Sequence, residues 1–183
     1  MMPFKISSVN VHGGENFKIK MDDIEVWGID KTKLVDIDIN TFRRTIKIVL
    51  TVDILNIGGT YDIDARILVL PIRGKGPANI TLHKPVMTYV QEWGLKELNG
   101  EIYGYTKNSK LAYDIERAEY NFQNLFNGNE RLGIETNRLL NENWGVVHSD
   151  VSSPVGQAIV SVVDSIIDAI YEVIPYKYLF IHD

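Results

Sequence analysis

The sequence contains no cysteine. Neither a disulfide framework nor a thiolate metal site is therefore available to the chain. Its apolar runs are short: the longest, Ile67–Ile72, has the length of a strand, whereas a membrane-spanning helix needs about 20 apolar residues. Residues 1–5 have neither the basic nor the apolar region of a signal peptide. Taken alone, these absences are typical of a cytoplasmic protein without stable membrane insertion.

The sequence also lacks an excess of basic over acidic residues. The 183 residues include 19 Lys and Arg against 24 Asp and Glu, which gives a net charge of −5. The densest basic stretches, Arg43-Arg44 and Arg73-Gly74-Lys75, are too short to neutralise a run of phosphates, so we expect no nucleic-acid partner. A composition of 45% hydrophobic and 23% charged residues is that of a globular protein. The length suits one domain over residues 1–183.

Residues 1–122 alternate between apolar and polar side chains, as expected for strands with one face on the core and one in water. The alternation is clearest in four segments: Phe17–Asp22, Asp36–Asn40, Ile46–Ile54 and Tyr61–Val69. Turn-type sequences separate such segments, and they are Gly13-Gly14, Asn56–Gly59, Asn99-Gly100 and Lys107–Lys110. This pattern predicts seven or eight antiparallel strands in a sheet that curls, because large twisted sheets do not stay flat.

Residues 130–183 are predicted to be mainly helical. One helix is expected from Glu130, and a second from Ser153-Pro154, with Ser as N-cap and Pro in the first turn, to about Ile174. The polar residues of the second helix form one stripe, and most of the remaining circumference is apolar. Because a helix that rests on one surface needs an apolar stripe of only about 100°, we expect the curled sheet to cover this helix on several sides. The predicted class is α+β.

A curled sheet around an apolar helix leaves either a filled core or a lumen with aliphatic walls, and the sequence leaves both possibilities open. If a lumen exists, it would hold a long apolar ligand. The candidate lining residues lie on one sheet face and on one side of the last helix: Ile46, Ile48, Leu50, Val52, Ile54, Ile63, Ile67, Val69, Ile159, Val163, Ile166 and Ile170.

Motifs for catalysis or metal binding are not found. The four histidines are scattered, Asp36–Asn40 begins like a calcium loop but Thr41 replaces its turn glycine, and no nucleophile has an evident base nearby. We therefore expect a protein that is not an enzyme and that has no cofactor and no metal site. Asn79-Ile80-Thr81 is a glycosylation sequon, with meaning only in a secreted protein.

Four segments give the chain a resemblance to the insect takeout and juvenile-hormone-binding protein family. They are Tyr61–Gly76, Asn124–Gly133, Asn137–Trp144 and Ile174–Phe180. The resemblance implies a tubular lipid-binding fold, in which a curved antiparallel sheet wraps a long helix around a hydrophobic tunnel. It also implies secretion into haemolymph and transport of juvenile hormone, fatty acids, terpenoids or quinones.

The sequence departs from this family at its start, since the signal peptide and a segment with a cysteine pair are absent. We therefore expect a chain that begins inside the family pattern, which would replace the cytoplasmic interpretation by a secreted one. Residue 65, an alanine here, is often glycine in the family.

The leading hypothesis is an extracellular carrier that binds one elongated lipophilic molecule. The alternative is an interaction or signalling protein with a filled core. A third reading, lipid transfer at membranes, requires an exposed apolar or basic docking end, which the sequence does not display. No receptor is indicated.

Overall fold

The structure, a computed structural model, describes residues 2–13 and 16–179. Its strands are β1 (Phe4–His12), β2 (Phe17–Trp27), β3 (Lys33–Asn40), β4 (Thr45–Thr51), β5 (Ile54–Ile67), β6 (Leu70–His83), β7 (Val86–Leu98), β8 (Glu101–Asp114) and β9 (Arg117–Phe122). Its helices are α1 (Glu130–Glu142) and α2 (Trp144–Val173), with short 3-10 helices η1 (Ile29–Lys31), η2 (Phe126–Gly128) and η3 (Tyr176–Tyr178). The predicted turn at Gly13-Gly14 and the family-like ending at Phe180 lie partly outside the described residues.

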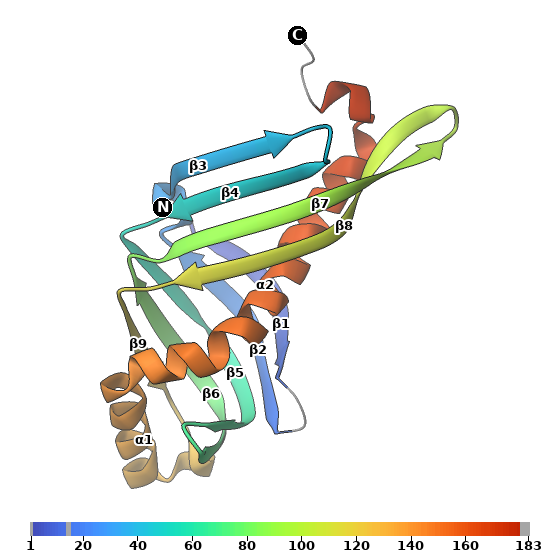
Figure 1. Ribbon diagram of the computed structural model, residues 1–183. Coiled ribbons are helices and arrows are strands. Elements are labelled where there is room, and N and C mark those ends of the chain that lie inside the picture. The colour runs from blue at the N-terminus through green and yellow to red at the C-terminus, as the bar shows by residue number, and fades with distance from the viewer. Residues whose placement is uncertain (1, 14–15, 180–183) are drawn as a thin grey trace.

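The described strands form two antiparallel sheets in a strongly curved arrangement. The five-stranded sheet has the order β1-β2-β5-β6-β9, and the four-stranded sheet has the order β3-β4-β7-β8. Figure 1 shows the two sheets at an angle to each other, with α2 crossing behind the four-stranded sheet. The predicted fold class, a curved antiparallel sheet with a long C-terminal helix, is confirmed. The described strands number nine rather than seven or eight.

The turn-type segments of the sequence have different positions in the structure. Asn99-Gly100 forms the expected β7–β8 turn, with φ of 52° and 81°. Asn56–Gly59 instead lies within β5, and Lys107–Lys110 lies within β8. A Cβ on Gly59 would stand 2.9 Å from the carbonyl oxygen of Asp22, so this glycine permits close contact with β2. The prediction of a turn at Asn56–Gly59 was wrong because glycine also marks close backbone approach.

The β5–β6 turn falls where the sequence predicted continuous strand. Leu68 and Val69 both have positive φ, 52° and 63°, although β-branched residues disfavour that conformation. The full pairing of β5 with β6, from Ile54–His83 to Ile67–Leu70, fixes the turn at these two residues. Val69 is consequently 82% exposed. The prediction that Val69 lines an interior was therefore wrong.

Two clusters of buried side chains fill the five-stranded half of the molecule. The larger one includes Tyr61, Ile63 and Ile67 of β5 together with Leu140 of α1. The second lies beside it and includes Val52. Three predicted lining residues thus belong to packed core, where close packing leaves few voids larger than a water molecule.

The helix boundaries differ from those predicted at the start of α2. The helix α1 begins as expected, after Asn129, whose side chain accepts a hydrogen bond from the backbone N of Leu132 at 3.1 Å. The helix α2 begins at Trp144, and Pro154 lies inside it rather than in its first turn. The residues before Pro154 stay helical because they bury an apolar side chain, that of Val147, in the larger core cluster. Tertiary packing here outweighs the unfavourable effect of an internal proline.

Two asparagines of α1 attach this helix to the edge strand β9. The carboxamide of Asn137 accepts from the backbone N of Phe122 at 2.8 Å and donates to its carbonyl at 2.9 Å. The carboxamide of Asn141, one turn later, does the same for Tyr120, at 2.7 Å and 2.8 Å. The spacing of four residues in the helix matches the spacing of two in the strand, so the amides pair with the edge as another strand would. We call these two residues the asparagine ladder.

Asn141→Leu is expected to lower the free energy of unfolding by about 2 kcal/mol, because it leaves a backbone N–H and a carbonyl of β9 unpaired. Urea unfolding measures the change. Asn143→Leu is the control, since the Asn143 amide donates only to the carbonyl of Leu139 in the same stretch of chain. An equal loss in both variants would contradict the role of the ladder.

Candidate functional site

The helix α2 contacts the four-stranded sheet through its polar residues. Tyr89 Oη of β7 donates to Asp164 Oδ1 at 2.7 Å. The backbone N of Thr106 in β8 donates to Asp168 Oδ1 at 2.8 Å. The polar stripe predicted for this helix therefore faces the protein over part of its length. Its carboxylates fix how the helix lies across β7 and β8.

A buried side-chain network continues this contact. Gln91 of β7 is 1% exposed. Its Oε1 accepts from Tyr171 Oη at 3.0 Å, and its Nε2 donates to Tyr89 Oη at 3.1 Å and to Thr106 Oγ1 at 3.0 Å. Burial, and secondarily the negative charge of Asp168, raises the pKa of Tyr171 to about 12. Tyr171 thus stays a neutral donor at physiological pH, and the network is structural, with every polar atom of Gln91 paired.

Because α2 contacts the sheet through this side, its apolar side is left uncovered. Ile159, Ile166 and Ile170 are exposed and Val163 is half-buried. Their spacing of four, three and four residues places them on one face of the helix, as predicted. The expectation that the sheet covers the helix on several sides holds for the first half of α2, where Val151, Val155 and Ala158 pack against the larger core cluster. From Ile159 to Ile170 the apolar face is largely exposed, while β7 and β8 bind the polar side.

The matching sheet surface lies on β4 and β3. In β4, Ile46 and Ile48 pair with Gln91 and Tyr89. Side chains of paired residues in neighbouring strands point to the same face, so both isoleucines point to the face that carries α2. Leu50 follows at the same period and, like them, is half-buried. The β3 residues that pair with these three are apolar and exposed, and they are Ile39, Ile37 and Leu34.

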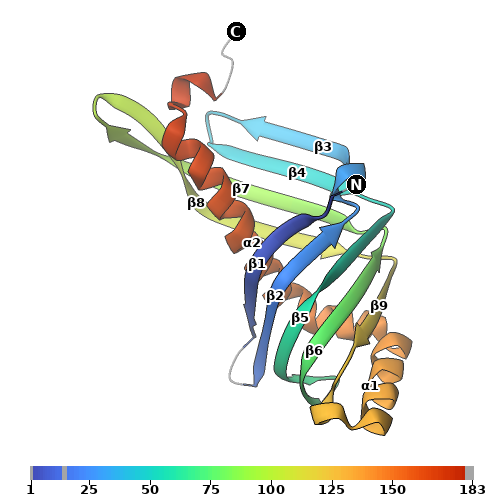
Figure 2. The same ribbon diagram turned by 180° about the vertical axis from the view of Figure 1, so that it is seen from behind.

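We call this combined surface the uncovered apolar face. It comprises Leu34, Ile37, Ile39, Ile46, Ile48 and Leu50 of the sheet, with Ile159, Val163, Ile166 and Ile170 of α2. Figure 2 shows this side: α2 crosses β8 and β7, and no helix lies over β3 and β4. Seven of the twelve predicted lining residues are brought together here.

The remaining candidates are placed elsewhere. Val52, Ile63 and Ile67 lie in packed core, and Val69 lies at the β5–β6 turn. Ile54 lies on the outer face of β5, because its neighbour Leu55 points into the second core cluster and side chains alternate along a strand. The alternating pattern of the sequence continues from Ile46 to Ile54 and therefore predicted one strand. In the structure the chain passes from β4 to β5 at residues 52 and 53.

Two pockets in the described part of the molecule lie apart from the uncovered apolar face, the first with a mixed lining and the second with a polar one. One, of about 500 Å³, lies between β8 and α2 and is lined by residues that include Ser109, Ser152, Ser153 and Gln157. The other, of about 390 Å³, lies over β6, β9 and α1. Among residues 2–13 and 16–179, no group of His, Asp or Glu side chains could hold a metal ion.

By length and composition, α2 is the one helix of the described chain that could cross a membrane. The helix is apolar on one side and hydrogen-bonded to the sheet on the other, through Asp164 and Asp168. The polar stripe of α2 is evident from the sequence, whereas the strands that it contacts are not. The contacts with β7 and β8 assign α2 to the folded domain.

Comparison with known proteins gives consistent results. The model of the haemolymph juvenile hormone binding protein family matches residues 1–181. The circadian clock-controlled protein daywake of Drosophila melanogaster is 27% identical over 171 residues, covering 90% of this chain. The chain spans 65% of the length of that relative. A Schistocerca gregaria protein named for beta-carotene binding is 33% identical over 76 residues, 41% of this chain and 30% of its own length.

A solved structure is similar over most of the fold. The crystal structure of Takeout 1 from Epiphyas postvittana superposes with a TM-score of 0.75 at 20% sequence identity. The match covers 96% of this chain and 80% of that one. At this identity the likeness concerns the arrangement of strands and helices.

Proposed function

Since the chain belongs to the haemolymph juvenile hormone binding protein family, we propose that it is a carrier for one elongated, lipophilic small molecule. The ligand would be of the juvenile hormone, fatty acid, terpenoid or quinone type and would lie along the uncovered apolar face. One relative is named for binding beta-carotene, which is a long hydrocarbon, and this supports an elongated ligand. We propose that this face forms one wall of the hydrophobic tunnel that holds the ligand.

The observation that carries the proposal is the exposure of aliphatic side chains on β3, β4 and α2, which share one face of the four-stranded sheet. Soluble proteins rarely expose large contiguous apolar patches unless they bind something. Burying about 350 Å² of a ligand on such a surface contributes about 9 kcal/mol before association costs. Aliphatic contacts alone therefore support useful affinity.

Binding without chemistry is the role that fits these residues. The family is a family of binding proteins, and the polar groups nearest to α2 bind one another. Gln91, Tyr89 and Tyr171 form a mutual network, and Asp164 and Asp168 accept hydrogen bonds from the sheet. These groups fix the helix, and none of them forms a nucleophile–base pair.

Secretion is the second part of the proposal. Family members are haemolymph proteins, and the sequon residue Asn79 is exposed on β6. A glycan at Asn79 would stand in solvent beside Asn121, its partner in β9, away from the uncovered apolar face. We propose that Asn79 is glycosylated in the protein from its own source.

Thermal unfolding tests the carrier function. A ligand at about 100 times its Kd adds about 2.7 kcal/mol to the free energy of unfolding, which raises Tm by roughly 5–10 °C for a chain of this length. We expect that rise with at least one of juvenile hormone, a long-chain fatty acid, a terpenoid or a quinone. A native mass spectrum of the protein from its own source should show a retained lipid and the glycan.

The alternative function is interaction with another protein through the surface. The five-stranded half favours it, because the predicted lining residues Ile63 and Ile67 belong to a cluster of buried core side chains there. An unchanged Tm with all four ligand classes, together with a native mass that contains no lipid, would contradict the carrier and favour this alternative.

A further inference from the structure

Apolar side chains from three distant segments are exposed at one end of the molecule. These segments are the β3–β4 turn, the β7–β8 turn, and the end of α2 with η3, and Figures 1 and 2 show them at the same end. Their exposed apolar residues are Phe42, Leu98, Ile102, Val173 and Tyr178. We call this region the docking end. Phe42 is the extreme case, with 94% of its surface exposed.

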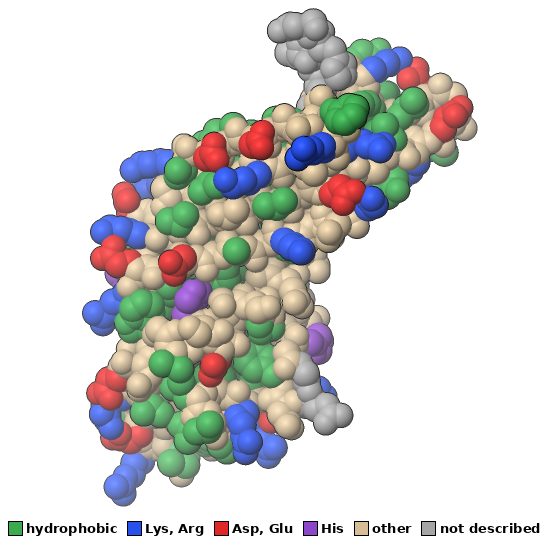
Figure 3. All heavy atoms as spheres, viewed as in Figure 1, with side chains coloured by type: hydrophobic (Ala, Val, Ile, Leu, Met, Phe, Trp, Pro, Cys, Tyr) green, Lys and Arg blue, Asp and Glu red, His purple; other side chains and the backbone are tan. Residues whose placement is uncertain are grey.

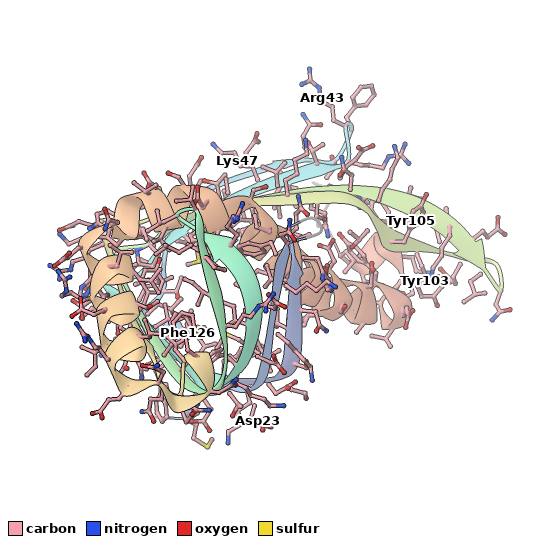
Figure 4. The ribbon with its side chains drawn as sticks, turned by 90° about the horizontal axis from the view of Figure 1, so that it is seen from below. Asp23, Arg43, Lys47, Tyr103, Tyr105 and Phe126 are labelled. Carbon is pink, nitrogen blue, oxygen red and sulfur yellow. The ribbon has the colours of Figure 1, made fainter. Side chains whose placement is uncertain are left out.

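The β3–β4 turn that carries Phe42 is held by specific hydrogen bonds. Asn40 Oδ1 accepts from the backbone N of Arg43 at 2.7 Å, and the carbonyl of Arg44 accepts from the backbone N of Trp93 at 3.0 Å. Figure 4 shows Arg43 pointing outward from this turn, away from the body of the protein. Because these bonds already fix the backbone of the turn, moving the Phe42 ring out of water into an apolar environment requires little further ordering of the turn.

The charge of the turn is unbalanced. Arg43 and Arg44 form no ion pair with any residue that the structure describes. Glu92, which pairs with Thr45 beside the turn, already binds Lys107 Nζ at 2.6 Å. On the outer face of the four-stranded sheet, by contrast, Figure 3 shows acidic and basic side chains interspersed. Two free arginines beside an exposed phenyl ring in a chain of net charge −5 form a local cationic, apolar tip.

We propose that the docking end binds the surface of a lipid bilayer that contains anionic lipids. Phe42 enters the interfacial region, and Arg43 and Arg44 contact lipid phosphates or carboxylates. Aromatic and aliphatic side chains next to Arg or Lys are the combination that interfacial binding uses. The apolar stripe of α2 ends here, at Ile170 and Val173, so a lipophilic molecule could pass between bilayer and protein without crossing water. This binding goes beyond the carrier function and requires no bound ligand.

Flotation with vesicles tests the proposal, using the full chain without added lipophile. Phosphatidylcholine vesicles that include phosphatidylserine should bind the protein, pure phosphatidylcholine should bind it weakly, and raised salt should weaken binding. Replacing Arg43 and Arg44 together by Ser should lower affinity for anionic vesicles, by about fivefold for each arginine. Phe42→Ser should lower it on both lipid compositions, by about tenfold.

Matched controls lie at the opposite end of the molecule. Val69→Ser changes another exposed apolar residue of a hairpin turn, and Arg66→Ser removes an exposed arginine of β5; both should leave binding unchanged. Phe42→Trp supplies a second measurement, since its emission should shift to the blue when anionic vesicles are added. Equal binding to neutral and anionic vesicles, equal losses in the controls, or no emission shift would overturn the proposal. Self-association in sedimentation that Phe42→Ser abolishes, without vesicle binding, would show that a second copy occupies this end.

The experiments distinguish failure of the bilayer-binding proposal from failure of the carrier function. The vesicle experiment contains no lipophilic ligand, and the thermal experiment contains no bilayer. A protein with a ligand-dependent Tm but no vesicle binding would retain the carrier function and lose the docking end.

Discussion

A variant with Ile166→Glu and Ile170→Glu should bind lipophilic ligands about a hundredfold more weakly, while its fold remains. Burying each isoleucine against a ligand contributes at least about 1.5 kcal/mol, and each 1.4 kcal/mol is about a factor of ten in Kd. The fold should persist because these side chains are 47% and 44% exposed without ligand. Titration with a fluorescent fatty acid measures the affinity, and circular dichroism reports the fold.

The same helix provides the control. Ser165→Glu and Ala169→Glu add the same two charges at exposed positions one residue earlier, on a different side of α2. If the control variant lost as much affinity as the isoleucine variant, the uncovered apolar face would not be the binding surface. A loss of helical signal in the isoleucine variant alone would mean that the two side chains are buried in solution.

Gln91→Ala should lower the free energy of unfolding by about 3 kcal/mol, which makes it the most destabilising change that we propose. The substitution removes the acceptor of Tyr171 and the donor to Tyr89 and Thr106, and it leaves a cavity. Urea denaturation followed by circular dichroism measures the effect. Gln157→Ala, at an exposed position of α2, is the control and should change stability by less than about 0.5 kcal/mol.

A double-mutant cycle with Tyr171→Phe separates this network from simple loss of volume. Because Gln91 and Tyr171 share a hydrogen bond, the effect of Tyr171→Phe should shrink by about 1 kcal/mol once Gln91 is alanine. Additive effects would mean that the bond does not couple α2 to β7, and the account of how the helix is positioned would then be wrong.

The sequence predicted features that depend on local pattern. Alternation identified the strand around Tyr61–Ile67, and Asn99-Gly100 identified a hairpin turn because both residues tolerate positive φ. The N-terminus of α1 followed from its change in periodicity. The family resemblance rested in part on the segment Asn137–Trp144. Two asparagines of this segment, Asn137 and Asn141, are the residues that bind β9.

Features that depend on distant contacts were not predictable. The apolar stripe of α2 shows which side of the helix is apolar, but the hydrogen bonds of Asp164 and Asp168 decide which side meets the sheet. In the same way, no local signal shows that Val52 lies in the connection after β4 with its side chain in the core, whereas Ile54 begins β5 and is exposed. Pro154 is a reliable helix-start signal in isolation, and only the packing of Val147 against the core overrides it.

The asparagine ladder also governs how chains meet one another. An open strand edge invites a neighbouring molecule to extend the sheet, which is a common route to aggregates. On β9 the backbone groups of Tyr120 and Phe122 are already satisfied by carboxamides, and a helix stands in front of them. This edge of the sheet is therefore blocked against further strand pairing, so the protein could reach a high concentration without chains associating along β9.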